Sequence, residues 1–350
     1  MRGLTRGERI LLLVLVLLTA IAGVTRYTDV SAVLAFAMSG LALAGLAWIV
    51  SFGTEQVGSR LGPAATGMLQ STLGNLPEFF VVVFALSKGE TVVAQTSLVG
   101  SILANALLVL GLVIVVGARQ THDGVMRFST GLPRDTATLL LLASSIIVIL
   151  GLSLASGDKA SHHIKAISSI GAVCILAVYV AWAIPYVRSG GGDAHAETRV
   201  SLPFAATLLA LGGVGSAFVS DWFIHALDPA VESLGISKAF AGLVIVAIAG
   251  NAVENAAGLV LAHKGQADLA ISVVKNSVAQ VAAFLFPALV LVSLLFTTPL
   301  TFSLAPVYIG AIILTAIVIA QVTGDGQATA FEGWALVAVY AIIAVVTLYE

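Results

Sequence analysis

Charged residues are scarce in this 350-residue chain, and their scarcity excludes most soluble folds. Only 10% of the residues are Asp, Glu, Lys or Arg, against about 25% in a typical soluble domain. By contrast, 59% are hydrophobic and the mean hydropathy is +1.06. Apolar stretches long enough to cross a bilayer recur from end to end and leave no segment for a sizeable soluble domain. We therefore expect an all-α polytopic membrane protein.

Cysteine and the common catalytic motifs are also lacking. The single cysteine, Cys174, lies inside a predicted span, which excludes a disulfide framework and a cysteine-based metal site. No nucleotide-binding glycine motif, zinc-protease motif or nucleophile–base pair is present. The net charge of −2 gives no indication of a nucleic-acid partner. We expect no enzyme activity and no cofactor, and as partners only inorganic ions and the lipid bilayer.

The hydrophobic pattern predicts about eleven transmembrane helices. An N-terminal apolar run could be a signal peptide, but further spans follow it directly, so we expect a first membrane helix. A polar, glycine-rich segment over residues 188–200 is typical of a flexible linker. The spans are predicted near residues 10–24, 31–52, 58–87, 91–117, 135–155, 164–187, 201–224, 238–263, 267–296, 301–321 and 330–349.

One short motif occurs twice. The sequence Gly-Asn-Leu-Pro-Glu at Gly74–Glu78 returns as Gly-Asn-Ala-Val-Glu at Gly250–Glu254, 176 residues later. The same offset carries Lys88-Gly89 to Lys264-Gly265 and Ser101 to Ser277. Internal symmetry of this kind is typical of transporters built from repeats.

The repeat divides the chain into four parts. These are an extra N-terminal helix (1–28), a first five-helix repeat (29–187), the linker (188–200) and a second five-helix repeat (201–350). An odd number of spans per repeat predicts a 1+5+5 layout in which the repeats are inverted. With a cytoplasmic N-terminus, ten Lys and Arg residues fall on inner segments and five on outer ones. We expect this orientation in a bacterial inner membrane.

Each motif places a glutamate within an apolar run. An ionisable side chain at mid-membrane costs about 2.5–3.5 kcal/mol on insertion scales, so Glu78 and Glu254 indicate an ion or proton path. Pro77 removes a backbone hydrogen bond and should break the first helix. In the second copy the break depends on Gly250, with Gly258 as a further candidate. Backbone carbonyls freed by such breaks coordinate cations in transporters.

Polar side chains on the helix after each motif could complete a site. Ser101 and Asn105 share a helix face, as do Asn276 and Gln280. Their oxygens suit hard cations such as Ca²⁺, which takes about six to eight oxygen ligands. The asparagines could instead only bridge helices, and the serines could only serve close packing. The candidate cation ligands are Asn75, Glu78, Ser101, Asn105, Asn251, Glu254, Ser277 and Gln280.

These paired motifs resemble the repeats of the Ca²⁺/cation antiporter superfamily, most closely its Ca²⁺/H⁺ antiporter branch. That branch centres on Gly-Asn-x-x-Glu, which both copies match, and the stretch Gly100–Asn105 fits its first repeat. The resemblance implies a central site where both glutamates bind either a divalent cation or protons. It departs from the family at Asn255, where a histidine is usual. The absence of an acidic residue after Asp268 in that helix argues against Na⁺ coupling.

Lys275 replaces part of the family's Gly-Ser stretch and is a possible modulator of the site. If charged and facing the site, it would leave a net charge of −1 with the two glutamates, which suits a monovalent cation. It could also carry a proton or pair structurally with an acid. We therefore expect Ca²⁺/H⁺ exchange by alternating access. The alternatives are Na⁺/H⁺ or K⁺/H⁺ exchange and, in another class, a cation channel.

Overall fold

The computed structural model describes residues 4–350 except 61–68, 70–71 and 189–197. The described chain is almost entirely helical, as expected. Before residue 189 it forms α1 (Arg6–Arg26), α2 (Ala32–Gly58), α4 (Leu76–Ser87), α5 (Thr91–Leu103), the π-helical η1 (Ala104–Val109), α6 (Leu110–Arg119), α7 (Gly131–Ser156), the 3₁₀ turn η2 (Lys159–His163) and α8 (Ile164–Arg188).

The second part of the described chain is again helical. It forms α9 (Leu202–Leu234), α10 (Lys238–Phe240), π-helical η3 (Ala241–Val246), α11 (Ala247–Gly250), α12 (Ala252–His263), α13 (Ala267–Gln280), π-helical η4 (Val281–Leu285), α14 (Phe286–Val292), η5 (Ser293–Leu295), α15 (Pro306–Thr323) and α16 (Ala330–Leu348). α9 continues ten residues past the predicted end of its span at 224.

Nine described helices are long and apolar enough to cross a membrane, and the number is ten if a bent pair is counted as one span. The bent pair is Lys238–Gly250 and Ala252–His263, which meet at 60°. The predicted break at Gly250 is thus confirmed, whereas the break proposed at Gly258 is wrong. Gly258 lies inside continuous α12, where it packs against Val274 and Val113. The total of eleven stays a prediction, because the span expected over 58–87 includes residues outside the described part.

The linker predicted over 188–200 also lies largely outside the described residues. Its last two residues, Arg199 and Val200, are described, and their backbone N–H groups donate to Gln56 Oε1 at the end of α2, over 2.8 and 3.3 Å. This end of the segment is therefore attached to the first repeat.

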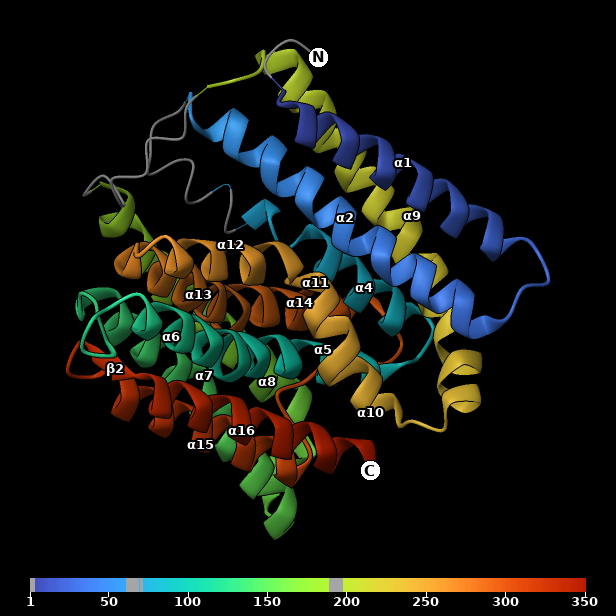
Figure 1. Ribbon diagram of the computed structural model, residues 1–350. Coiled ribbons are helices and arrows are strands. Elements are labelled where there is room, and N and C mark those ends of the chain that lie inside the picture. The colour runs from blue at the N-terminus through green and yellow to red at the C-terminus, as the bar shows by residue number, and fades with distance from the viewer. Residues whose placement is uncertain (1–3, 61–68, 70–71, 189–197) are drawn as a thin grey trace.

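Two groups of helices lie side by side (Figure 1). α2 and α9 pack along each other, with α1 against both, and form a tilted layer at the upper right of the view. The remaining helices form a bundle beside it, with α15 and α16 at its lower edge. α4 and the α10–α12 segment lie where the two groups meet and contact both. Both glutamate motifs belong to these intervening helices.

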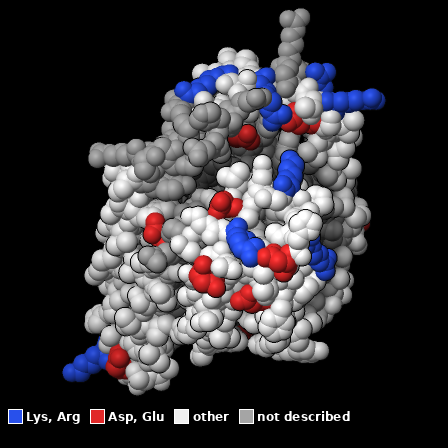
Figure 2. Space-filling model, turned by 60° about the vertical axis from the view of Figure 1, so that its left-hand side comes forward, with Lys and Arg blue, Asp and Glu red and all other residues white. Residues whose placement is uncertain are grey.

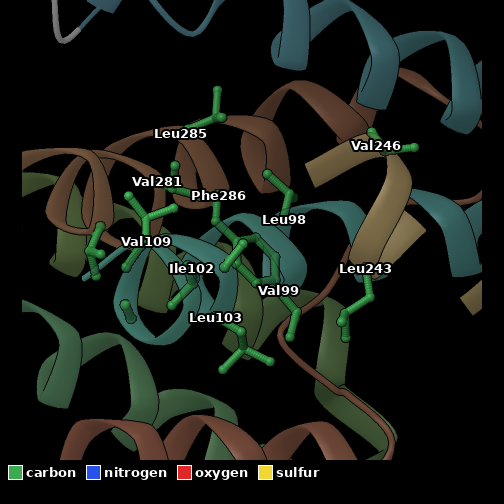
Figure 3. Packing of buried hydrophobic residues seen from close by; sticks show 14 of the residues in the cluster. Leu98, Val99, Ile102, Leu103, Val109, Leu243, Val246, Val281, Leu285 and Phe286 are labelled. Carbon is green, nitrogen blue, oxygen red and sulfur yellow. The ribbon is translucent and has the colours of Figure 1, made fainter. Parts of the chain in front are cut away.

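The centre of the bundle is apolar and contains the interrupted helices. Figure 3 shows side chains of α5 and of the π-helical segments η3 and η4 converging there. Leu98, Ile102, Leu103, Leu243 and Val281 are at most 1% exposed. Packing of this density fixes the positions of the polar residues on the same helices.

One small departure from the all-α expectation is a two-stranded antiparallel ribbon. Strand β1 (Val125–Arg127) pairs with β2 (Gln327–Thr329), with Met126 opposite Ala328. It joins the loop after α6 to the loop before α16. On the face drawn in Figure 2 most of the described surface is uncharged, and acidic and basic side chains gather in a few mixed clusters.

Candidate cation site

The two glutamates occupy equivalent positions at two helix starts. Asn75 immediately precedes α4 and Asn251 immediately precedes α12, with similar backbone angles (φ −88°, ψ 11° and φ −105°, ψ 15°). The first helical hydrogen bonds also correspond, from Phe79 N to Asn75 O and from Asn255 N to Asn251 O. Each glutamate is the third residue of its helix. The duplicated sequence therefore gives duplicated local geometry.

The Glu78 carboxyl is buried and makes no hydrogen bond of normal geometry to the described residues. Glu78 is 1% exposed, and neither of its carboxyl oxygens has a hydrogen-bond partner in the described part of the chain. The Ser101 hydroxyl lies near this carboxyl without forming a hydrogen bond of normal geometry, and the Glu254 carboxyl places a second acidic group nearby. A buried carboxylate without a partner is expensive, so an unsatisfied one calls for an occupant such as a proton or a cation.

A small cavity adjoins this carboxyl. It has a volume of about 10 Å³ and is lined by Glu78, Pro77, Val81 and Gly250, together with Leu43, Phe223, Val246 and Ala249. That volume is about the size of one water-sized occupant. A Cβ atom added to Gly250 would lie 3.7 Å from Glu78 Cβ, so the break of the second repeat lies directly against the glutamate of the first.

A buried hydrogen-bond network joins both repeats next to the glutamates. Asn105 Nδ2 donates to Asn251 Oδ1 (3.0 Å) and to Ser277 Oγ (2.8 Å). Asn251 Nδ2 donates to Ser101 Oγ (2.8 Å) and to the Ala247 carbonyl (2.9 Å). Ser277 Oγ lies 3.4 Å from Asn251 Oδ1. Four of the eight candidate ligands are thus brought together by direct contacts.

The other candidates differ in their surroundings. Asn75 is buried at the start of α4, and Glu254 is half-buried at the start of α12. Gln280 is half-buried at the end of α13 and, among the described residues, is not part of the Asn–Ser network. Gln70 and Ser71, which precede the first motif, lie outside the described residues.

Lys275 is directed away from the network. It is 0% exposed, and its Nζ donates to Thr323 Oγ1 on α15 at 3.2 Å. Residues two positions apart on an α-helix are rotated by about 200° around its axis. Lys275 and Ser277 therefore lie on nearly opposite faces of α13. The structure therefore separates this amine from the residues that surround Asn251.

Reciprocal glycines let the two repeats approach closely enough to form the network. A Cβ atom on Gly100 of α5 would lie 2.3 Å from the Leu243 carbonyl oxygen, and one on Gly242 of η3 would lie 2.0 Å from Thr96 Oγ1. Neither distance is possible for a real side chain, so only glycine permits this crossing. The residue after Gly100 is Ser101, which contacts Asn251. Close backbone packing therefore places a candidate ligand from the first part of the chain against Asn251 in the second part.

The π-helical segments were not anticipated from the sequence. η1 contains Asn105, and η4 begins directly after Gln280. Moved by 176 residues, the range of η1 falls on 280–285, almost the range of η4. A π-turn widens the helix and is frequent at functional sites. No residue type is specific to a π-turn, so the sequence gives no direct signal for one. The only available signal was the 176-residue offset, which relates the two π-helical segments.

The arrangement can bind a hard cation through oxygen atoms. In the described chain, no three His, Cys, Asp or Glu side chains come together. A cation here would take two carboxylates and otherwise neutral amide, hydroxyl and carbonyl oxygens. Such a set suits Ca²⁺, which accepts mixed oxygen ligands in flexible geometry.

Sequence comparison places the chain in a family. The model of the sodium/calcium exchanger protein family matches residues 31–184 and again residues 204–349, so the chain belongs to that family. The resemblance to its Ca²⁺/H⁺ antiporter branch is likewise confirmed by individual relatives. The chain is 32% identical to a vacuolar calcium ion transporter of Schizosaccharomyces pombe, over 97% of this chain and 84% of that protein. It is 30% identical to the Ca(2+)/H(+) antiporter ChaA of Bacillus subtilis, over 90% and 92% of the two chains.

Solved structures show the same fold. Native YfkE superposes with a TM-score of 0.81 at 27% identity and covers 97% of this chain and 99% of its own. The H⁺/Ca²⁺ exchanger CAX gives a TM-score of 0.78 at 17% identity, over 98% and 93% of the two chains. The second likeness concerns the fold alone.

Proposed function

We propose that this integral membrane protein is a Ca²⁺/H⁺ antiporter in which Glu78 and Glu254 carry the cargo. The observation that carries the proposal is the buried carboxyl of Glu78, which makes no geometric hydrogen bond to any described residue and lies near a polar network from both repeats. Family membership and relatives named as Ca²⁺/H⁺ antiporters support the same cargo.

Charge balance explains how the two cargoes alternate. Two carboxylates with one Ca²⁺ carry no net charge, and two carboxylic acids with no cation carry none either. The emptied, ionised site would hold two negative charges within the membrane, which is the costly state. The site therefore changes sides loaded with Ca²⁺ or with two protons, and exchange follows from avoiding the empty state.

The interrupted helices allow this exchange to be gated. α4 and α12 start at the site, and α5 and α13 are interrupted by π-helical turns beside it. Small rigid movements of one group of helices against the other open the site to one side at a time, as in other repeat transporters. Lys275 bonds to Thr323 away from the network, which favours a divalent cargo over the monovalent alternative.

The proposal is tested in proteoliposomes with a pH-sensitive dye. An outward proton gradient should drive Ca²⁺ uptake, and Na⁺ or K⁺ in place of Ca²⁺ should give no dye response. Glu78→Gln and Glu254→Gln should each abolish exchange without loss of folded protein. Glu90→Gln, which changes a carboxylate paired with Lys238, is the matched control and should retain exchange. Gradient-driven uptake that survives either site variant would refute the scheme, and Ca²⁺ flux independent of protons would indicate a channel.

For orientation, we propose a bacterial plasma membrane with the N-terminus in the cytoplasm, supported by the excess of Lys and Arg on the inner segments. In a Cys174→Ser background, Ala160→Cys should react with an impermeant maleimide added to intact cells, whereas Thr121→Cys should not. Both positions are exposed, so the reverse pattern would invert the topology.

A further inference from the structure

An apolar groove runs along α1 where this helix meets α2 and α9. It has a volume of about 420 Å³ and is lined by Leu12, Val16, Gly23, Leu46, Leu211 and Gly215, among others. The groove follows α1 from Leu12 to Gly23, a rise of about 16 Å at 1.5 Å per residue. The hydrocarbon core of a bilayer is about 30 Å thick, so this groove is as long as one leaflet is deep.

A polar pocket of about 160 Å³ lies at one end of this groove. Thr25, Arg26 and Thr28 line it from the end of α1, and His225 lines it from α9. The Nε atom of Arg26 is buried and has no hydrogen-bond partner in the described part of the chain. The guanidinium stacks on Tyr27, with 5.3 Å to the ring centroid.

The charge of this pocket is positive. Lys88 and Asp221, which also act on His225, neutralise each other in an ion pair of 3.1 Å. Asp29 is exposed in the adjoining turn and does not line the pocket. Among the described residues Arg26 is therefore the pocket's charge without an ion-pair partner, and its unpartnered Nε–H favours an anion with oxygen acceptors.

The groove and the pocket adjoin each other at Trp222. Both are lined by Trp222, and on each of the three helices the residues of the pocket lie beyond the same end of the groove. On α2 the pocket is lined by Ser39 and the groove by Leu46. On α9, which runs the other way, the pocket is lined by His225 and the groove by Gly215. A ligand that fills both therefore has an anionic head and an apolar chain about one leaflet long.

We propose that this cleft is a binding site for an anionic phospholipid. The phosphate is held by Arg26, whereas the hydroxyls of Thr25 and Thr28 donate to carbonyls of α1, and one acyl chain lies in the groove beside this helix. Bilayers supply such lipids, and basic pockets between membrane helices bind their head groups. The lipid fastens α1 to α2 and α9, the first helices of the two repeats.

The test is native mass spectrometry of the full chain in detergent, after removal of bound lipid. Phosphatidylglycerol and phosphatidylcholine with identical acyl chains are added in turn. Both lipids offer a phosphate to Arg26, but phosphatidylcholine adds a positive charge beside this uncompensated guanidinium, so the native chain should prefer phosphatidylglycerol by about tenfold. Arg26→Gln should remove the preference, whereas Arg119→Gln, which changes an exposed arginine at the end of α6, should keep it.

A second pair of variants tests the groove. Ala20→Phe places a ring in the groove and should lower binding of both lipids, whereas Leu13→Phe on the outer face of α1 should not. Phosphatidylglycerol should also raise the unfolding temperature of the native chain but not of Arg26→Gln. An unchanged preference in Arg26→Gln would overturn the proposal. Displacement of the lipid by inorganic phosphate at millimolar concentration would overturn it as well, because the pocket would then belong to a free anion.

Discussion

The crossing of α5 and η3 gives the sharpest prediction about the site. In Gly100→Ala the new Cβ would lie 2.3 Å from the Leu243 carbonyl oxygen, and a real Cβ essentially never approaches closer than 3.0 Å. The two backbones must therefore separate by at least 0.7 Å. Transmitted to the neighbouring Ser101–Asn251 hydrogen bond of 2.8 Å, this displacement lengthens it to about 3.5 Å, the limit of a useful bond.

Two effects follow from this displacement. Overpacking should lower the free energy of unfolding by about 1–3 kcal/mol. Loss of a hydrogen bond worth about 0.5–1.5 kcal/mol should weaken Ca²⁺ binding by roughly two- to tenfold. The matched control is Gly310→Ala on α15, where an added Cβ meets nothing within 4 Å. It should be neutral or slightly stabilising, since alanine favours helix.

The assay measures Ca²⁺ dependence of uptake in proteoliposomes, beside thermal unfolding of the same preparations. Native affinity and native unfolding temperature in Gly100→Ala would refute the reasoning that this crossing positions the site.

Three further predictions concern the polar residues. Lys275→Met should retain Ca²⁺ affinity in uptake assays. It should also raise the unfolding temperature, since it replaces a buried amine bonded to Thr323 by an apolar chain of similar length. A changed affinity would place the amine at the site. Asn251→Ala should lower thermal stability and abolish uptake, because each buried group left unsatisfied costs about 1–3 kcal/mol. Asn255→Ala should lower the free energy of unfolding less, because the Oδ1 of Asn255 has no partner in the described chain. Apparent Ca²⁺ affinity should rise with pH by up to about tenfold per unit for each proton displaced, and a pH-independent affinity would rule out competition for shared carboxylates.

The motif and the helix break beside it could be predicted from the sequence because each depends on neighbouring residues. Gly250, Asn251 and Glu254 lie within five residues, and the break follows from these residues and from the matching motif at Gly74–Glu78. The bend of 60° at this place agrees with that prediction. Gly258 shows the limit of the argument, because a glycine inside a helix can equally serve close packing, as it does here against Val274.

The partners across the site were not accessible in the same way. Spacing places Ser101 and Asn105 on one helix face but does not reveal that both contact Asn251 of the other repeat. That pairing depends on how closely α5 and η3 approach, which is set by glycines more than 140 residues apart. The direction of Lys275 likewise depends on the position of α15, so the sequence left its role open.

The central claim is that protons and Ca²⁺ occupy the same two carboxyls. It is tested most directly by equilibrium Ca²⁺ binding to the purified chain with simultaneous measurement of the protons released. The account predicts that the native chain releases protons as Ca²⁺ binds from the protonated state, and that Glu78→Gln and Glu254→Gln each lose both binding and release. Native Ca²⁺ affinity with undiminished proton release in either variant would contradict it.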